Sequence, residues 1–326
     1  MNSIDRRKLL FAIASGALAA ASSPLGFALP VTRQLKGIFP IAFTPVGASG
    51  AIDYGGLKAQ VQFCRRTAVH GLAWPQIASG WTTLTEAERM QGAEVLIDEA
   101  RGGSTCIVIG VQSRTADFAE TARYAKHAQR QGADAIICIA PSGVTAGADL
   151  LSYYQRLGEA SSLPLFVQTG GDFSVDLLVE LFNAVPTCRY VKDEAGDPLE
   201  RVREIRQRTA GRLNCFSGKG VATLITEMER GFVGHCPFIS FADFYASAYN
   251  AYHAGKMREA FEQFGRIQAA ASMFAQSDIN ILIARGVLQP GTTARLAPAL
   301  TTPAKHLAYT PDDIRRRLET YLKRPI

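Results

Sequence analysis

The chain has 326 residues, of which 47% are hydrophobic and 20% are charged. This balance is typical of a globular protein and excludes a disordered, fibrous or membrane-embedded chain. The formal net charge of +6 comes from 35 basic and 29 acidic residues. The basic stretches at 201–212 and 315–317 have the spacing of solvated helix faces and lack interleaved aromatic residues. We therefore predict no nucleic-acid partner.

The first residues have the pattern of an export signal. The pair Arg6-Arg7 precedes the uncharged run Leu9–Ala21, and small residues precede a cleavage point after Ala28. Paired arginines are typical of the twin-arginine pathway, although Asp5 stands where serine or threonine is usual. The apolar run is shorter than the ~20 residues of a membrane-spanning helix. We predict a signal peptide at 1–28, a leader at 29–36 and a periplasmic protein without a stable membrane span. The alternative is a membrane anchor or an N-terminus without a targeting role.

The cysteines show no metal-binding or redox pattern. None of the six forms a Cys-x-x-Cys pair or another zinc spacing. Most lie in or beside apolar runs, where cysteine behaves as a small hydrophobic residue. We therefore expect buried thiols and no metal site.

From residue 37 onward, short apolar runs alternate with amphipathic segments. We expect strands at Gly37–Phe43, Gly71–Pro75, Thr105–Val111, Ala135–Ala140, Pro164–Gln168, Arg189–Lys192, Leu213–Phe216 and Phe232–His235. We expect helices at Tyr54–Thr67, Glu86–Glu99, Ala116–Gln131, Asp149–Ala160, Val175–Phe182, Pro198–Arg208, Val221–Arg230 and Phe241–His253. Eight strand–helix units in a row predict a (β/α)8 barrel, the TIM barrel, over 37–255. Further helical segments predict a C-terminal helical extension at 256–326.

In such barrels the active site lies at the carboxyl ends of the strands. Lys192 ends the apolar run of the sixth strand, where an inward side chain would meet the barrel interior. A free lysine has a pKa near ~10.4, and burial lowers the pKa of a lysine because it disfavours the ammonium form. The resulting neutral amine can attack a ketone and form a Schiff base. The alternative is a strand-end lysine that reaches solvent or pairs with Asp193 or Glu194.

Several motifs resemble one family of lyases. They are Gly37–Pro45 (GIFPIAFTP), Leu84–Arg89 (LTEAER), Gly132–Ala135 (GADA), Leu163-Pro164, Val191–Asp197 (VKDEAGD) and Ser217-Gly218. In order and spacing they resemble the dihydrodipicolinate synthase / N-acetylneuraminate lyase family of class I, pyruvate-linked lyases. The resemblance implies that Lys192 forms a Schiff base with a 2-keto acid and that no dissociable cofactor is needed. It also implies a homo-oligomer, often a tetramer.

The loop after the second strand departs from the family pattern. The family's Gly-Thr-Thr-Gly-Glu loop binds the keto-acid carboxylate, whereas this chain has Ile77–Trp81 (IASGW). We expect the Ser79 hydroxyl and the amides of Ser79 and Gly80 to receive the carboxylate. Thr44, Gln168 and Cys236, at the ends of other strands, are further predicted substrate-binding residues.

The family's proton-relaying tyrosine is also missing, since the fourth strand is followed by Pro141-Ser142-Gly143. Schiff-base chemistry needs an acid–base group, so another side chain must replace the phenol. The candidates are Ser142, Thr169, Asp193, His235 and Lys219, of which Lys219 is alternatively a solvated lysine. The arginine that follows the family's fifth strand is absent as well, so a second carboxylated substrate is not expected.

Two functions remain open from the sequence. The first is a Schiff-base aldolase or dehydratase acting on a 2-keto acid. The second is a catalytically degenerate periplasmic barrel that binds a small molecule. The aromatic residues Trp74, Trp81 and Phe173 indicate either an apolar substrate part or ordinary barrel packing.

Overall fold

The structure is a computed structural model that describes residues 34–115, 117–145, 147–171, 173–219, 222–274, 277–296 and 309–322. The predicted signal peptide at 1–28 lies outside these residues. The chain divides into two units, Met1–Gln34 and Leu35–Ile326, and every element named below belongs to the second.

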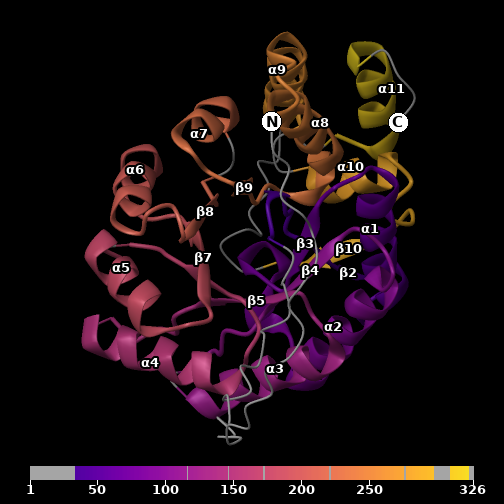
Figure 1. Cartoon of the computed structure of the whole chain (residues 1–326). Coiled ribbons are helices and arrows are strands. Elements are labelled where there is room, and N and C mark those ends of the chain that lie inside the picture. Colours follow the sequence, from indigo (N-terminus) through magenta and orange to yellow (C-terminus); the bar gives the residue numbers. More distant parts are fainter. Residues whose placement is uncertain are drawn as a thin grey trace, which may run out of the picture. The chain divides into compact units, whose positions relative to one another are not determined.

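Eight parallel strands form the centre of this unit, surrounded by helices (Figure 1). They are β1 (Gly37–Ile38), β3 (Gly71–Trp74), β4 (Cys106–Gly110), β5 (Ala135–Ile139), β6 (Leu165–Gln168), β7 (Cys188–Asp193), β8 (Asn214–Ser217) and β9 (Gly234–His235). Neighbouring strands pair in the order β1-β9-β8-β7-β6-β5-β4-β3. Ile41 bridges both Ala73, next to Trp74 in β3, and Phe238, beyond β9. These bridges bring the two ends of the sheet together, and the predicted (β/α)8 barrel is confirmed.

The helices follow the strands in chain order. They are α1 (Tyr54–Arg66), α2 (Glu86–Ala100), α3 (Phe118–Gln131), α4 (Gly147–Ala160), α5 (Val175–Ala184), α6 (Pro198–Arg208), α7 (Leu224–Arg230) and α8 (Ala242–His253). Side-chain caps fix several of their starts, because the first amides of a helix lack intrahelical partners. The Thr85 hydroxyl accepts from the Glu88 amide, and the Glu88 carboxylate accepts from the Thr85 amide. Asp53 and Asp197 cap α1 and α6 in a similar way.

Aromatic rings from β6, β7 and β8 pack against one another inside the barrel. Phe166 stacks on Tyr190 with ring centroids 4.4 Å apart, and both rings approach Phe216. Gly234 leaves room for this cluster, since a Cβ there would lie 2.1 Å from the Phe216 ring. Side chains alternate between the two faces of a strand. Lys192, two residues beyond the inward Tyr190, therefore also faces the interior.

Three more helices follow the barrel: α9 (Met257–Met273), α10 (Asp278–Ala284) and α11 (Pro311–Leu322). Helix α9 packs along α8, and α11 packs on α10. Three short 3-10 turns, η1 (Ile77–Ser79), η2 (Trp81–Thr83) and η3 (Ile239–Phe241), precede α2 and α8.

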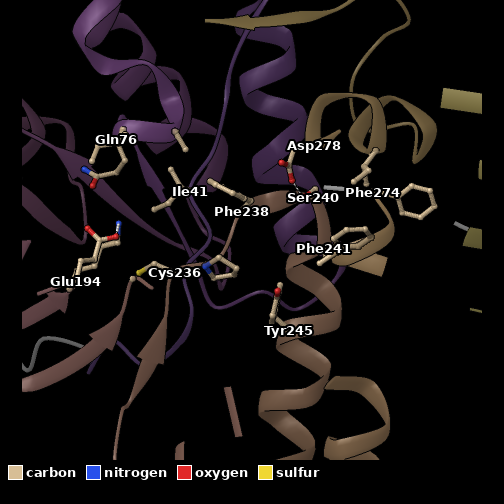
Figure 2. A pocket seen from close by; sticks show the side chains of 17 residues that line it. Ile41, Gln76, Glu194, Cys236, Phe238, Ser240, Phe241, Tyr245, Phe274 and Asp278 are labelled. Carbon is tan, nitrogen blue, oxygen red and sulfur yellow. Dashed lines mark hydrogen bonds and ion pairs between the residues drawn. The ribbon is translucent and has the colours of Figure 1, made fainter. Parts of the chain in front are cut away.

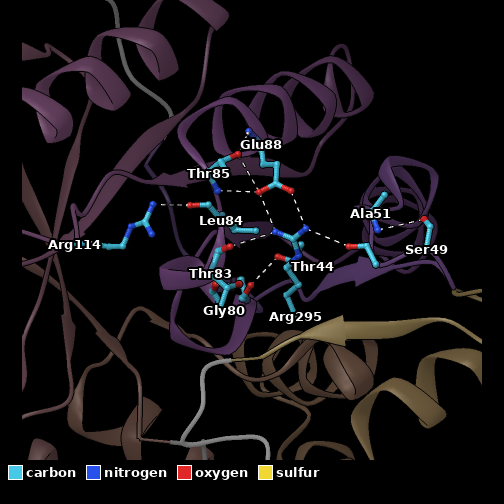
Figure 3. A network of polar contacts seen from close by, with 12 residues as sticks. Thr44, Ser49, Ala51, Gly80, Thr83, Leu84, Thr85, Glu88, Arg114 and Arg295 are labelled. Atoms are coloured by element: carbon cyan, nitrogen blue, oxygen red, sulfur yellow. Dashed lines mark hydrogen bonds and ion pairs between the residues drawn. The ribbon is translucent and has the colours of Figure 1, made fainter.

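A small second sheet ties this C-terminal part to the start of the barrel. Strand β10 (Thr293–Arg295) pairs antiparallel with β2 (Thr44–Val46), a strand that the sequence did not predict. The Arg295 guanidinium pairs with Glu88 at 2.8 Å and donates to the Gly50 and Thr83 carbonyls (Figure 3). Residues from the two ends of the unit are thereby held side by side.

All six cysteines are free thiols with buried side chains. Of the helices in the described ranges, none is both long and apolar enough to span a bilayer.

Candidate active site

A pocket of about 430 Å³ lies between the strand ends and the C-terminal helices (Figure 2). Lys192, at the carboxyl end of β7, is one of the residues that line it and is only 5% exposed. Its Nζ lies 3.1 Å from Oε1 of Glu194. The amine therefore reaches the pocket while it is protected from bulk water, and it forms the ion pair with Glu194 that the sequence left as an alternative.

Glu194 lies beside Lys192 because the two residues are two positions apart, so both side chains face the pocket. Its Oε2 accepts a hydrogen bond of 2.6 Å from Gln168 Nε2, at the end of β6. Gly218 provides the space, because a Cβ there would lie 2.5 Å from both Cγ and Oε1 of Glu194. A carboxylate with a fixed position thus stands next to the amine.

Sequence reasoning did not assign Glu194 a chemical role. The alternation of side chains along a strand could have indicated it, because residues 192 and 194 then face the same side. Gln168, predicted to bind substrate, donates a hydrogen bond to Glu194.

Two of the predicted proton-relay residues lie behind the strands. Asp193 faces α6, where the Arg201 guanidinium donates to it at 2.9 and 3.1 Å. Thr169 donates to Asp193 at 2.7 Å and accepts from the Glu194 amide at 2.8 Å. Neither residue lines the pocket. Their contacts join the ends of β6 and β7 and fix the backbone of Glu194.

His235 also lies behind the strands. Its Nδ1 is 2.8 Å from Oε2 of Glu227 in α7, and the ring is fully buried. Ser217 and Thr223 donate to the other carboxylate oxygen of Glu227, at 2.9 and 3.0 Å. This buried network joins β8 and β9 to α7. The fourth predicted relay residue, Ser142, is exposed in the loop after β5 and is not part of the pocket lining.

The predicted carboxylate site is occupied by contacts within the protein. The Ser79 hydroxyl donates to the Ala42 carbonyl at 2.5 Å, and the Ser79 amide donates to the Gln76 carbonyl at 2.9 Å. The Gly80 amide donates to Ile77 at 3.0 Å. Thr44 is fully buried and donates to the Ser79 carbonyl at 2.7 Å. These groups hold the turn together, and it is Gln76, Ile77 and Ala78 of this loop that line the pocket.

Cys236, predicted to bind substrate, lines the pocket between Lys192 and the far wall. Burial raises the pKa of its thiol to about 12, although the positive charge of Lys192 acts in the opposite direction. The thiol is therefore neutral near pH 7, and it offers a small, weakly polar surface and not a thiolate.

The opposite wall comes from the segment after β9 and from α8, α9 and α10. It is mostly apolar and includes Phe238, Phe241 and Phe274. The aromatic residues expected here from the sequence, Trp74, Trp81 and Phe173, do not line the pocket. Trp74 is instead fully buried, with its indole N–H on the Thr44 hydroxyl.

Comparison with known proteins identifies the family of this barrel. The model of the dihydrodipicolinate synthetase family matches residues 34–306, which include every strand of the barrel and the whole pocket lining. The chain belongs to the dihydrodipicolinate synthetase family.

Members of this family are similar to the chain in sequence at a moderate level. A 4-hydroxy-tetrahydrodipicolinate synthase of Rhizobium meliloti is 28% identical over 197 residues, which are 59% of this chain and 66% of the relative. The enzyme of the same name from Methylobacterium radiotolerans is 28% identical over 59% of this chain and 64% of its own length. The aligned region thus spans just under two thirds of these relatives.

Solved structures share the fold. The dihydrodipicolinate synthase of Rhodopseudomonas palustris aligns with a TM-score of 0.73 and 21% identity, over 88% of this chain and 97% of its own. YagE of E. coli K12, a prophage protein of the dihydrodipicolinic acid synthase family solved in complex with pyruvate, gives 0.74 and 18%, over 89% and 99%. An N-acetylneuraminate lyase of Mycoplasma synoviae gives 0.71 and 17%, over 89% and 97%.

The network around Glu227 predicts a pH dependence of stability for this family member. Burial raises the pKa of Glu227, but hydrogen bonds from His235, Ser217 and Thr223 outweigh it, and the pKa falls below the ordinary 4.5. A carboxyl with a lowered pKa stabilises the fold above its unfolded pKa, and this contribution is lost as the pH falls through the folded pKa. Glu227→Gln should lower the free energy of unfolding near neutral pH by about 1–3 kcal/mol.

Urea unfolding at a series of pH values from about 7 to about 3 measures this effect. The loss of stability toward acid should be shallower in Glu227→Gln than in the wild type. Glu229→Gln, an exposed change in the same helix, is the control and should follow the wild-type curve. Parallel curves for Glu227→Gln and the wild type would contradict the prediction.

Proposed function

We propose that the protein is a Schiff-base-forming carbon–carbon or carbon–oxygen lyase that acts on a 2-keto acid. The observation that carries the proposal is the position of Lys192, with its Nζ at the pocket and 3.1 Å from a carboxylate. Membership of the family and the YagE complex with pyruvate support the same chemistry. Lys192 is the covalent nucleophile, and no dissociable cofactor takes part.

Glu194 takes the place of the missing tyrosine as the proton-transfer group. The Lys192 ammonium gives a proton to the Glu194 carboxylate, and the neutral amine then attacks the carbonyl carbon of the substrate. A proton passes from the nitrogen to the oxygen to give the carbinolamine, and Glu194 returns its proton to that oxygen, which leaves as water as the iminium forms. In a carbon–carbon cleavage the iminium accepts the electron pair of the bond that breaks and becomes an enamine. In a carbon–oxygen cleavage the iminium accepts the pair of the neighbouring C–H bond as Glu194 takes the proton, and the enamine then expels the oxygen, which leaves with the C–O pair and a proton. A group that transfers these protons must lie at the pocket. Glu194 lines the pocket, whereas the relay candidates Asp193, Thr169 and His235 do not, so we favour Glu194.

Reductive trapping tests the covalent step. Incubation with pyruvate and borohydride should fix an adduct on Lys192 that peptide mass spectrometry locates. Lys192→Ala should give no adduct, whereas Lys219→Ala should be labelled as the wild type. Lys219 is an exposed lysine whose Nζ donates to the Gly196 carbonyl at 2.7 Å, so it controls for labelling of exposed amines.

Failure to trap any of a panel of 2-keto acids would count against the lyase. The second function, a catalytically degenerate barrel that binds a small molecule, is favoured if a ligand binds equally well to the wild type and to Lys192→Ala without turnover. The replacement of the family's tyrosine and of its carboxylate loop is the observation behind this second function.

The role of Glu194 has its own test, which needs no knowledge of the second product. An enzyme that forms an enamine from pyruvate exchanges the methyl protons of pyruvate with D₂O, and NMR follows this exchange. Glu194→Gln keeps an acceptor for Gln168 but cannot carry the proton, so the exchange rate should fall by about 10²–10⁴-fold. Borohydride trapping on Lys192 should still occur after long incubation.

Glu159→Gln, at an exposed position on α4, is the matched control and should exchange as fast as the wild type. An unchanged exchange rate in Glu194→Gln would assign proton transfer to another group. The covalent role of Lys192 would survive that result.

We also propose that the protein is exported to the periplasm by the twin-arginine pathway and forms a homo-oligomer. The arginine pair Arg6-Arg7 and the following apolar run support export, and the resemblance to the family supports assembly. Fractionation of the cells should find the wild type and Lys8→Arg in the periplasm. A double Arg6→Lys, Arg7→Lys variant should stay in the cytoplasm. Export of this variant at the wild-type level would contradict the proposed twin-arginine export.

A further inference from the structure

The pocket wall opposite Lys192 combines aromatic rings with one carboxyl group. Phe238, Phe241 and Phe274 come from the segment after β9, from η3 and from the end of α9, and Tyr245 comes from α8. Asp278, the first residue of α10, lines the same wall. Figure 2 shows Asp278, Phe241, Phe274 and Tyr245 on one side of the pocket and Glu194 on the other.

The Asp278 carboxyl has a neutral hydrogen-bond partner. The Ser240 hydroxyl donates to Asp278, while the Ser240 carbonyl accepts from Arg285 at 2.6 Å. Arg285, which directly follows α10, is paired with Asp243 through two contacts of 2.9 and 2.7 Å. The charge of Arg285 is therefore already neutralised by another carboxylate.

One ionisable group of the pocket has no cation beside it in the described lining. Three side chains of this lining can carry a charge, and two of them, Lys192 and Glu194, pair with each other. The third is Asp278, which is half-buried. Burial raises the pKa of Asp278, with the Ser240 hydrogen bond acting in the opposite direction, so the surroundings favour the neutral carboxyl. A cationic ligand would stabilise the carboxylate form and take the place of the proton as its counter-charge.

The rings that line the same wall as Asp278 suit the same kind of ligand. The faces of phenylalanine and tyrosine rings attract cations, and aromatic cages bind ammonium groups. Burial and the charge of Asp278 both raise the pKa of Tyr245, so its phenol stays neutral and keeps a hydrogen-bond donor and acceptor at this wall.

We propose that this wall is a subsite for a protonated amine, formed by Asp278, Tyr245 and the rings of Phe238, Phe241 and Phe274. The inference rests on the proposed function in one respect: it assigns the ammonium group to the end of the substrate remote from the carbonyl that reacts with Lys192. The substrate class is then an amine-bearing carbonyl compound and not a dicarboxylate. A second carboxylate at this end would face Asp278 and lack a cation to pair with.

Small aromatic ligands of similar size and different charge test the subsite without any turnover. Benzylammonium, benzyl alcohol and benzoate are titrated into the wild type by calorimetry or by ligand-observed NMR. The ammonium should bind most tightly and benzoate most weakly. Asp278→Asn keeps the size of the side chain and a partner for Ser240, and it should weaken benzylammonium by about ten-fold or more while benzyl alcohol is unchanged.

Controls separate this proposal from the covalent chemistry. Asp312→Asn removes one negative charge at an exposed position of α11 and should bind all three ligands as the wild type does. Lys192→Ala should retain the preference for the ammonium, and Asp278→Asn should still be trapped by pyruvate and borohydride. If borohydride traps no 2-keto acid on wild-type Lys192 but the preference for the ammonium depends on Asp278, the subsite is supported and the lyase function is contradicted.

The subsite is overturned by either of two results. Benzoate or benzyl alcohol binding as tightly as benzylammonium would show that the wall does not select a cation. An unchanged benzylammonium affinity in Asp278→Asn would show that the carboxylate does not hold it.

Discussion

The ion pair between Lys192 and Glu194 is the interaction on which the site depends. The two side chains lie on the inner face of β7 and of the residues that follow it. Gln168 donates a hydrogen bond to the Glu194 carboxylate, and Gly218 leaves room for it, so that it lies 3.1 Å from the Lys192 amine. An ammonium without this partner would be a costly charge at a site that is 5% exposed. The pair therefore allows a strand end to carry an amine at the pocket, and in the proposed lyase it supplies the group that takes the proton of this amine.

The outer faces of the same strand ends perform a different task. Asp193 with Arg201, and His235 with Glu227, connect the strands to α6 and α7 through buried hydrogen bonds. Alternation along a strand thus separates the groups that face the pocket from the groups that hold the strand in place. This separation explains why polar residues that follow one another in sequence, such as Lys192 and Asp193, face different surroundings.

The barrel was predictable because each strand is a short apolar run and each helix has an amphipathic period, with side-chain caps at the starts of α1, α2, α3, α5 and α6. The location of Lys192 at the pocket was predictable from its place at a strand end and from the motif around it. The hydrogen bonds of Ser79 and Gly80 were not predictable, because they belong to a turn that depends on contacts with Ala42 and Thr44. The far wall was missed because Phe241, Phe274 and Asp278 are separated in sequence and meet only through the packing of α8, α9 and α10. Strand β2 was missed because its partner β10 lies about 250 residues later, and pairing over that distance has no local signal.

The late position of the far wall has a consequence for synthesis. A nascent chain that has emerged through β9 holds all eight strands and the lysine, yet it lacks Phe274, Asp278 and the strand that pairs with β2. The barrel can begin to pack at that stage, because its contacts are between neighbouring units. The chamber that would enclose a ligand is completed only when Phe274, Asp278 and β10 have left the ribosome. Termination of the chain before Phe274 would therefore yield a barrel whose pocket lacks this wall.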